Sequence, residues 1–128
     1  MKIEGKSVIV AGGTSGLGEA TVRKLHSQGA RVTILDVDSD RGKTLQSDLK
    51  QGSAFIETDV RDETSVQLAI DQAIQQHGGL HVLVNCAGIL IAEKVLGKEG
   101  PHDLGRFADV IQINLIGTFN TLRLAAAA

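Results

Sequence analysis

The amino-acid sequence predicts an α/β protein in which an open parallel sheet is covered by helices on both faces. Short apolar runs rich in β-forming residues alternate with longer amphipathic runs, and glycines mark most borders between them. Because crossovers between parallel strands are right-handed, this alternation predicts a doubly wound, three-layer α/β/α arrangement with strand order 3-2-1-4. We expect a single domain over residues 1–128, incomplete because a sheet of this order continues beyond its fourth strand.

The first two rounds of strand and helix lie in the first half of the chain. The apolar run Ser7–Ala11 predicts the first strand, and a helix is expected at 17–28 because Gly29 follows it as a C-cap glycine. Arg31–Asp36 predicts the second strand, and the amphipathic run at 39–50 predicts the second helix.

The next two rounds begin with a strand at 54–58 and a helix at 64–76, where apolar residues recur at helical spacing. Val82–Asn85 predicts the fourth strand. The loop that follows, 89–103, is long for a simple connection, and such loops are often functional. Apolar residues at helical spacing then predict a long helix that runs to the end of the chain: Leu104, Phe107, Ala108, Ile111, Leu115, Phe119 and Leu122.

The composition is typical of an ordinary globular protein, with 42% hydrophobic and 22% charged residues. A net charge of -2 argues against a nucleic-acid partner, which usually requires a basic surface. No apolar run approaches the ~20 residues that cross a bilayer, so no membrane partner is expected. With a single cysteine there can be no intramolecular disulfide, which favours a reducing compartment, and we expect the cytoplasm.

A glycine-rich turn follows the first predicted strand, with Gly12, Gly16 and Gly18 spaced as GxxxGxG. Glycine permits the tight turn, the close approach of a pyrophosphate and the packing of the helix on the sheet. The N-terminus of the helix would offer unpaired N–H groups to the phosphates. The pattern predicts a Rossmann-type dinucleotide site, and the alternative is a tight strand-to-helix turn without a ligand.

Asp36 ends the second predicted strand, 18 residues after Gly18, close to the ~20 expected for the acid that binds the adenosine ribose. A carboxylate at this position accepts hydrogen bonds from the ribose hydroxyls and would repel the 2′-phosphate of NADP. Neither Ser15 nor Val37 supplies a compensating positive charge, so we expect NAD as the cofactor. The alternative is a solvated turn aspartate, which is how we interpret the nearby Asp38 and Asp40.

The fourth predicted strand ends in Asn85, Cys86, Ala87 and Gly88. Together with the glycine turn and Asp36, this NCAG sequence makes the whole chain resemble the short-chain dehydrogenase/reductase family. The family usually has threonine where this chain has Ala11, which removes a hydroxyl that ties the turn to the sheet, and it usually reads NNAG at the fourth strand. The resemblance implies that the four NCAG residues border the cofactor, with Cys86 beside its ribose and Gly88 allowing close passage of the chain.

The resemblance implies roles for further residues. Ser15 and Leu17 match positions that touch the pyrophosphate and the nicotinamide side of the cofactor. Asp59 and Val60 match the pair that binds the adenine amino group and lines the adenine pocket. Asn114 matches the family's catalytic asparagine, which kinks the long helix and holds a water in the proton relay.

These assignments have simpler alternatives. Asp59 could cap the following helix, Cys86 could be a small buried apolar residue, and Asn114 could be a polar position on the helix. The four histidines (His26, His77, His81 and His102) have no metal-ligand spacing and are expected to be surface or capping residues.

The resemblance also implies an activity, the transfer of a hydride between a secondary alcohol or ketone and NAD. The NCAG variant, the loop at 89–103 and the run from Asn114 to Asn120 are similar to the type 2 3-hydroxyacyl-CoA dehydrogenases, which implies an acyl-CoA as the small-molecule substrate. The sequence contains no tyrosine, so the family's catalytic Ser, Tyr and Lys set is expected outside these residues. We expect a homo-oligomer, and the alternative function is a non-catalytic dinucleotide-binding or interaction module.

Overall fold

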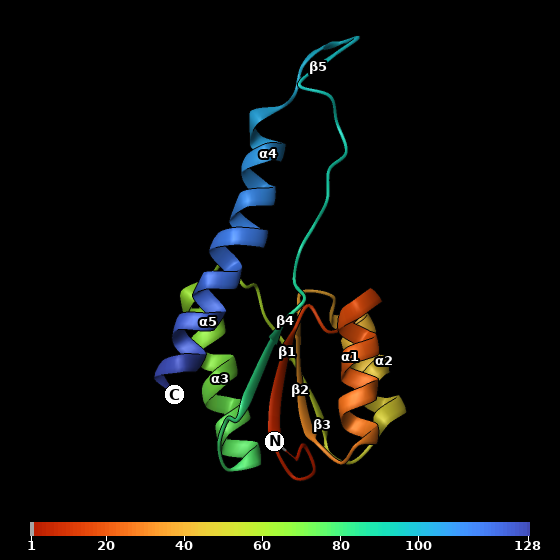
Figure 1. The fold of residues 1–128 in the computed structure, drawn as a ribbon, viewed down its shortest axis with the longest axis vertical. Coiled ribbons are helices and arrows are strands. Elements are labelled where there is room, and N and C mark those ends of the chain that lie inside the picture. The colour runs from red at the N-terminus through yellow and green to blue at the C-terminus, as the bar shows by residue number, and fades with distance from the viewer. Residues whose placement is uncertain (1) are drawn as a thin grey trace.

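In the computed structural model, which describes residues 2–128, four parallel strands form the central sheet (Figure 1). The strands are β1 Ser7–Ala11, β2 Arg31–Asp36, β3 Ser53–Glu57 and β4 Val82–Asn85. Their order is β3-β2-β1-β4, which confirms the order predicted from the sequence. Among residues 2–128, β4 pairs only with β1, in the register Val8 to Val82 through Ala11 to Asn85, so β4 is an edge strand of the sheet described here.

Three helices connect these strands: α1 Gly16–Ser27, α2 Ser39–Leu49 and α3 Glu63–His77. The side chain of Asp38 accepts from the backbone N–H of Arg41 and caps α2, and Asp62 caps α3 in the same way through Thr64. The predicted bounds agree with the observed bounds to within about two residues. Since Asp62 occupies the N-cap of α3, Asp59 is not the cap of that helix.

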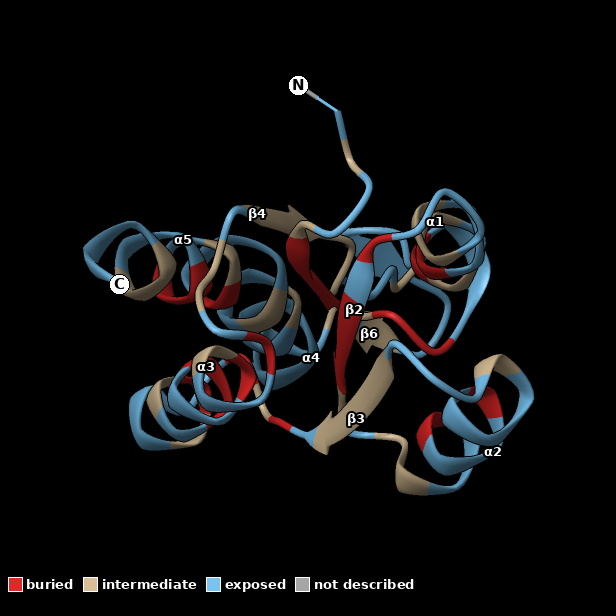
Figure 2. Cartoon of the chain, turned by 90° about the horizontal axis from the view of Figure 1, so that it is seen from below, coloured by how far each residue is buried: buried red, intermediate tan, exposed pale blue. Residues whose placement is uncertain are grey.

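The core lies on both faces of the sheet because successive residues of a strand point to opposite sides. Val8 and Val10 pack in a cluster with Val22 of α1 and Leu45 of α2, while Ile9 packs in the cluster beneath α3. All four residues named from β1 and α1 are fully buried, and each contributes about 1.5–3 kcal/mol by leaving water. Figure 2 shows the sheet between α1 and α2 on one side and α3 and α5 on the other.

The C-terminal helix is continuous but is not wound uniformly. It consists of α4 Leu104–Ile111, a π-helical stretch η1 Gln112–Gly117, and α5 Thr118–Ala127. Hydrophobic spacing predicted one long helix and does not reveal a π-helical stretch, whereas the family resemblance implied a kink at Asn114, which lies within η1. π-Helical turns inside α-helices are uncommon and occur frequently at functional sites.

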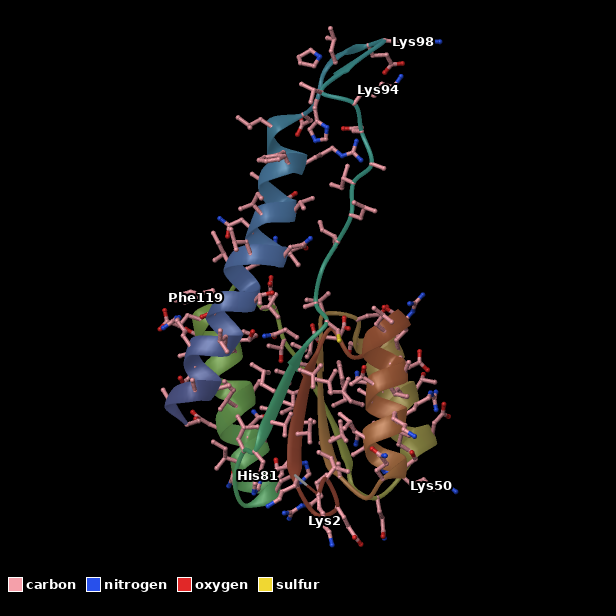
Figure 3. The ribbon with its side chains drawn as sticks, viewed as in Figure 1. Lys2, Lys50, His81, Lys94, Lys98 and Phe119 are labelled. Atoms are coloured by element: carbon pink, nitrogen blue, oxygen red, sulfur yellow. The ribbon has the colours of Figure 1, made fainter. Side chains whose placement is uncertain are left out.

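The loop expected at 89–103 contains a small antiparallel ribbon of two strands, β5 Leu96–Gly97 and β6 Gly100–Pro101. Together with α4 it extends as an arm well beyond the sheet (Figure 1). Lys94 and Lys98 lie toward the tip of this arm (Figure 3).

The two sides of the arm are joined by Glu93. Its carboxylate accepts from Arg106 of α4 and lies 3.1 Å from Nδ1 of His102. The long loop is therefore fastened to α4 near its outer end.

One histidine differs from expectation. His77 was predicted to be a surface or capping residue, but only 9% of it is exposed. Burial lowers its pKa, with a smaller contribution from the positive charge of Arg31. Within residues 2–128, no group of three potential ligand side chains could hold a metal ion, and no helix has the length and apolarity to span a membrane.

Candidate functional site

A cleft of about 410 Å³ opens at the carboxyl ends of the four strands, where ligands bind in open α/β sheets. It is bordered by the turn after β1 and by the segments that follow β2, β3 and β4. Of the cofactor residues expected from the sequence, all except Asn85 line it. The lining residues are Gly12, Ser15, Gly16, Leu17, Gly18, Leu35, Asp36, Val37, Thr58, Asp59, Val60, Arg61, Cys86, Ala87, Gly88, Ile89 and Ile113.

The glycine turn is compact because side chains are excluded at two of its positions. A Cβ on Gly12 would overlap the backbone of Ala87, and φ at Gly12 is +72°. A Cβ on Gly18 would overlap the carbonyl oxygen of Gly12. These glycines are therefore needed for the turn itself, before any ligand binds.

The turn is tied to the sheet by its backbone. The N–H groups of Gly12 and Gly13 donate to the carbonyl of Leu35, at 2.7 and 3.3 Å. The N–H of Cys86 donates to the carbonyl of Ala11 at 2.8 Å, which joins the turn to β4. The threonine hydroxyl that is missing at Ala11 is thus not the only means of anchoring this turn.

We expect Gly18→Ala to destabilise the protein by about 1–3 kcal/mol, the usual cost of forcing extra atoms into a packed region. The measurement is thermal or urea unfolding. Gly97→Ala is the matched control, because a Cβ there would have an ordinary contact at 3.6 Å. Equal stability of the two variants would contradict the close packing of the turn.

The start of α1 offers hydrogen-bond donors to the cleft. Ser15 is the N-cap residue, and its side chain makes no capping hydrogen bond. The first N–H groups of a helix have no intrahelical partners, and they carry the positive end of the helix dipole. This end of the cleft is suited to an anion such as a pyrophosphate.

The carboxylate of Asp36 lies at the rim of the same turn and is held by two backbone donors. Thr14 N–H donates to Oδ2 at 3.1 Å, and Asp38 N–H donates to Oδ1 at 3.2 Å. A carboxylate has about four acceptor positions, so about two remain for hydroxyl groups of a ligand. Asp36 is therefore a fixed acceptor beside the start of α1, unlike Asp38, which caps α2.

Asp59 and Val60 follow β3 at the other side of Asp36. The guanidinium of Arg61 binds both oxygens of Asp59, with Nη2 at 2.7 Å from Oδ2 and Nε at 3.0 Å from Oδ1. This hydrogen bonding lowers the pKa of Asp59 and raises that of Arg61. Asp59 is thus an ionised acceptor in the cleft, and Val60, which is 7% exposed, supplies an apolar wall beside it.

The residues after β4 separate into two groups. Cys86, Ala87 and Gly88 line the cleft, and Cys86 is a half-buried free thiol. Asn85 does not line it, because its Oδ1 accepts from the hydroxyl of Thr121 at 2.7 Å. Its side chain fixes β4 to α5.

Asn114 lies in η1 and is joined to the segment after β4. Its Oδ1 accepts from the N–H of Ile89 at 2.8 Å, and its Nδ2 donates to the carbonyl of Ile89 at 2.9 Å. Ile89 and Ile113 both line the cleft. Asn114 is therefore more than an isolated polar position on the helix, and it holds the cleft wall against the π-helical stretch.

Sequence reasoning missed residues that support the cleft from behind. Nδ2 of Asn120 donates to the carbonyl of Val60 at 2.9 Å, and Thr121 holds Asn85. A Cβ on Gly117 would come within 2.5 Å of Val60, so this glycine lets the helix approach closely. Asn120 and Thr121 are buried, whereas the apolar residues that marked the expected helix face, such as Leu115, are exposed, so the hydrophobic spacing gave no signal for these two residues. In the sequence, Arg61 could be noted only as a positive charge two residues after Asp59.

The chain is similar to known proteins over almost its whole length. Residues 6–128 match the family model described as short chain dehydrogenase. A 3-hydroxyacyl-CoA dehydrogenase type-2 of Bos taurus is 43% identical over 126 residues, which are 97% of this chain and 48% of that protein. The protein of the same name from Homo sapiens is 40% identical over 126 residues, with the same coverage of 97% and 48%.

A solved structure has the same fold. The crystal structure of 3-hydroxyacyl-CoA dehydrogenase type-2 from Mycobacterium avium has a TM-score of 0.87 and 42% sequence identity, covering 96% of this chain and 48% of that one. The chain spans about half the length of the curated relatives it matches.

Proposed function

The chain belongs to the short-chain dehydrogenase family, and from that premise we propose that it forms the NAD-binding part of an oxidoreductase that acts on a secondary alcohol or ketone. The chain spans about half the length of its relatives, so the activity we propose is that of the complete protein. The relatives are oxidoreductases, which supports the reaction class.

The observation that carries the choice of NAD is the carboxylate of Asp36. Two backbone N–H groups fix it beside the glycine turn, and its remaining acceptor positions suit the two hydroxyls of an unmodified ribose. A 2′-phosphate at this point would meet a fixed negative charge. The neighbours Ser15 and Val37, which also line the cleft, carry no charge that would offset it.

The residues of the cleft fit the parts of a dinucleotide in order across the sheet. The open N-terminus of α1 would hold the pyrophosphate, Asp36 the ribose, and Asp59 with Val60 the adenine. The other half of the cofactor would lie along Cys86 to Gly88. When bound, NAD supplies the hydride acceptor of the reaction.

We assign Asn114 to this site as a positioning residue. Through Ile89 it holds the segment after β4, which would border the nicotinamide half of the cofactor. One hydrogen of its Nδ2 and one lone pair of its Oδ1 are left for a water or a neighbouring side chain. A water bound by these two free groups would correspond to the water in the proton relay that the family resemblance implies.

For the substrate we propose a 3-hydroxyacyl-CoA. The support is the name shared by the relatives from Bos taurus and Homo sapiens and by the solved structure from Mycobacterium avium. Oxidation of 3-hydroxybutyryl-CoA by the complete protein, followed by NADH absorbance, tests it. NAD binding without turnover of any alcohol would favour the non-catalytic binding module.

The complete protein is expected to prefer NAD over NADP by more than tenfold in kcat/KM, or about 1.4 kcal/mol. Asp36→Ser removes the negative charge and is expected to reduce that preference by about tenfold. Asp40→Ser, a change of the same type on the exposed side of α2, is the matched control and is expected to leave it unchanged. Equal efficiency with both cofactors in the unmodified protein would mean that Asp36 does not face the ribose.

A further inference from the structure

Three buried polar atoms on one side of the sheet lack a hydrogen-bond partner. They are Oγ of Ser7, Oγ1 of Thr33 and Nε2 of His77, and none of them finds a partner among residues 2–128. Ser7 and Thr33 are fully buried, and His77 is nearly so. Buried polar atoms are nearly always paired, either with protein groups or with an ordered water.

All three residues belong to the same layer. Ser7 lies two residues before Ile9, and Thr33 lies two residues before Leu35, so each shares a strand face with a member of the core cluster beneath α3. His77 is a buried residue of α3 itself. The unpaired atoms therefore lie between the sheet and α3.

The three residues also lie toward the same end of the sheet, opposite the cleft. Ser7 begins β1, and α3 runs back from the end of β3 to the start of β4, which brings its last residue, His77, to that end. Nδ1 of His81 accepts from Ser7 N–H at 3.2 Å, and His81 N–H donates to the Ser7 carbonyl at 3.0 Å. Figure 3 shows His81 at this end. Both backbone groups of Ser7 are thus engaged, and only Oγ is left.

One small molecule could reach all three atoms. Ser7 pairs with Arg31, so Thr33 is its diagonal neighbour on the next strand, with the two Cα atoms about 8 Å apart. A water that makes two hydrogen bonds spans about 5.5 Å, which suits two hydroxyls that point to the same side. Helical side chains lean toward the N-terminus of their helix, and Ala73, one turn before His77, has only a methyl group. The imidazole can therefore extend toward the level of Thr33.

The chemistry of the three groups selects a neutral ligand. Burial lowers the pKa of His77, and the positive charge of Arg31 lowers it further, so the imidazole is neutral near pH 7. Two hydroxyls and a neutral imidazole carry no charge that would compensate a buried ion. A water donates two hydrogen bonds and accepts two, so it can satisfy the three groups with either tautomer of His77.

We propose that Ser7, Thr33 and His77 form an internal water site at the amino end of the sheet, where one buried water joins β1 and β2 to the end of α3. This site is independent of the proposed function, because none of its three residues lines the cleft. It fixes the end of α3 that is farther from the cleft, while Asp62 caps the other end.

Thr33→Val in the complete protein tests the site by the sign of its effect, because valine keeps the shape of threonine and lacks the hydroxyl. If the hydroxyl binds a water, the variant loses a hydrogen bond, and the apparent Tm is expected to fall by about 2–4 °C. If the hydroxyl has no partner at all, its removal relieves a buried unpaired group and the Tm rises.

A double-mutant cycle tests whether the groups share one water. Ser7→Ala is also expected to lower the Tm, and the loss in Ser7→Ala with Thr33→Val is expected to be smaller than the sum of the two single losses. Val66→Ala is the matched control, since Val66 is fully buried in the same core cluster near the other end of α3. Its loss is expected to add to that of Thr33→Val.

A high-resolution crystal structure of the complete protein gives the direct readout. A water oxygen is expected within about 3.2 Å of all three atoms. The inference is overturned by a Tm that rises or stays constant in Thr33→Val, by additive losses for Ser7 and Thr33, or by the absence of this water. All of these variants are expected to bind NAD with Kd changed by less than about twofold, so none of these results bears on the proposed function.

Discussion

Gly16→Val is expected to abolish NAD binding while the fold is largely retained. Gly16 lines the cleft, and a Cβ at this position would meet no protein atom within 4 Å, so the added side chain would extend into open space at the start of α1. That space is where the backbone must approach the pyrophosphate. We expect Kd to rise at least a hundredfold, or about 2.8 kcal/mol.

Backbone strain must be separated from this loss, because φ at Gly16 is +51° and valine adopts such a conformation poorly. Gly5→Val is the matched control. Gly5 has a φ of +72° and equally open surroundings, but it precedes β1 and lies outside the cleft. Gly16→Asn is a second variant, since asparagine tolerates a positive φ.

Titration with NAD and far-ultraviolet circular dichroism should be measured for all three variants. Gly5→Val is expected to lose stability but to bind NAD normally, whereas both Gly16 variants are expected to fold without binding. A folded Gly16 variant with unchanged affinity would contradict the assignment of the pyrophosphate to this turn.

A polypeptide limited to residues 1–128 is expected to show no dehydrogenase activity with any alcohol. The family resemblance implies a catalytic tyrosine, and these residues contain none. The cleft holds residues suited to binding and positioning, and Asn114 is the one candidate within these residues for a part in proton transfer. The assay is NAD reduction with 3-hydroxybutyryl-CoA, run beside the complete protein.

The same polypeptide is expected to self-associate. β4 has an unpaired edge, and exposed apolar side chains follow the outer helix, including Phe107 at 55%, Leu115 at 63% and Phe119 at 63% exposure. Figure 3 shows Phe119 pointing away from the sheet. An open edge strand and an apolar surface of this kind both favour pairing with another chain.

Size-exclusion chromatography tests this, and one double variant separates the two surfaces. Leu115→Lys with Phe119→Lys is expected to reduce association if the helix is the contact, whereas association that persists in this variant indicates pairing through the β4 edge. A monodisperse monomer of 13.5 kDa that oxidised 3-hydroxyacyl-CoA would overturn both parts of this expectation.

Much of the architecture could be predicted from the sequence because it depends on local patterns. The apolar residues 8–11 of β1 and the helical spacing in α3 are visible within a few residues, and right-handed crossovers leave few ways to order the strands. The position of the cleft follows from the strand order, since the glycine turn and Asp36 both stand at carboxyl ends of neighbouring strands.

Other features depended on contacts between residues far apart in the chain. His77 was expected to be a surface or capping residue, but it is buried in the helix that packs against the sheet. The carboxamide of Asn85 is bound by Thr121, 36 residues later, so it faces α5 and not the cleft. A hydrophobic pattern indicates an apolar face, but it does not identify the polar partners of an element, and in the C-terminal helix the apolar face with Leu115 and Phe119 is exposed.

The sequence by itself therefore determined the order of the strands, the edge position of β4, and the residues that gather at the cleft, because these depend on periodicity, glycine geometry and chain connectivity. Only the tertiary structure decided how the side chains are directed. The fork of Arg61 on Asp59, the bond between Asn114 and Ile89, and the π-helical stretch in the long helix are examples. Each of these depends on backbone or side-chain torsion angles that are set by the hydrogen-bond partners available in the folded protein. Those partners come from distant parts of the chain, so the local sequence does not identify them.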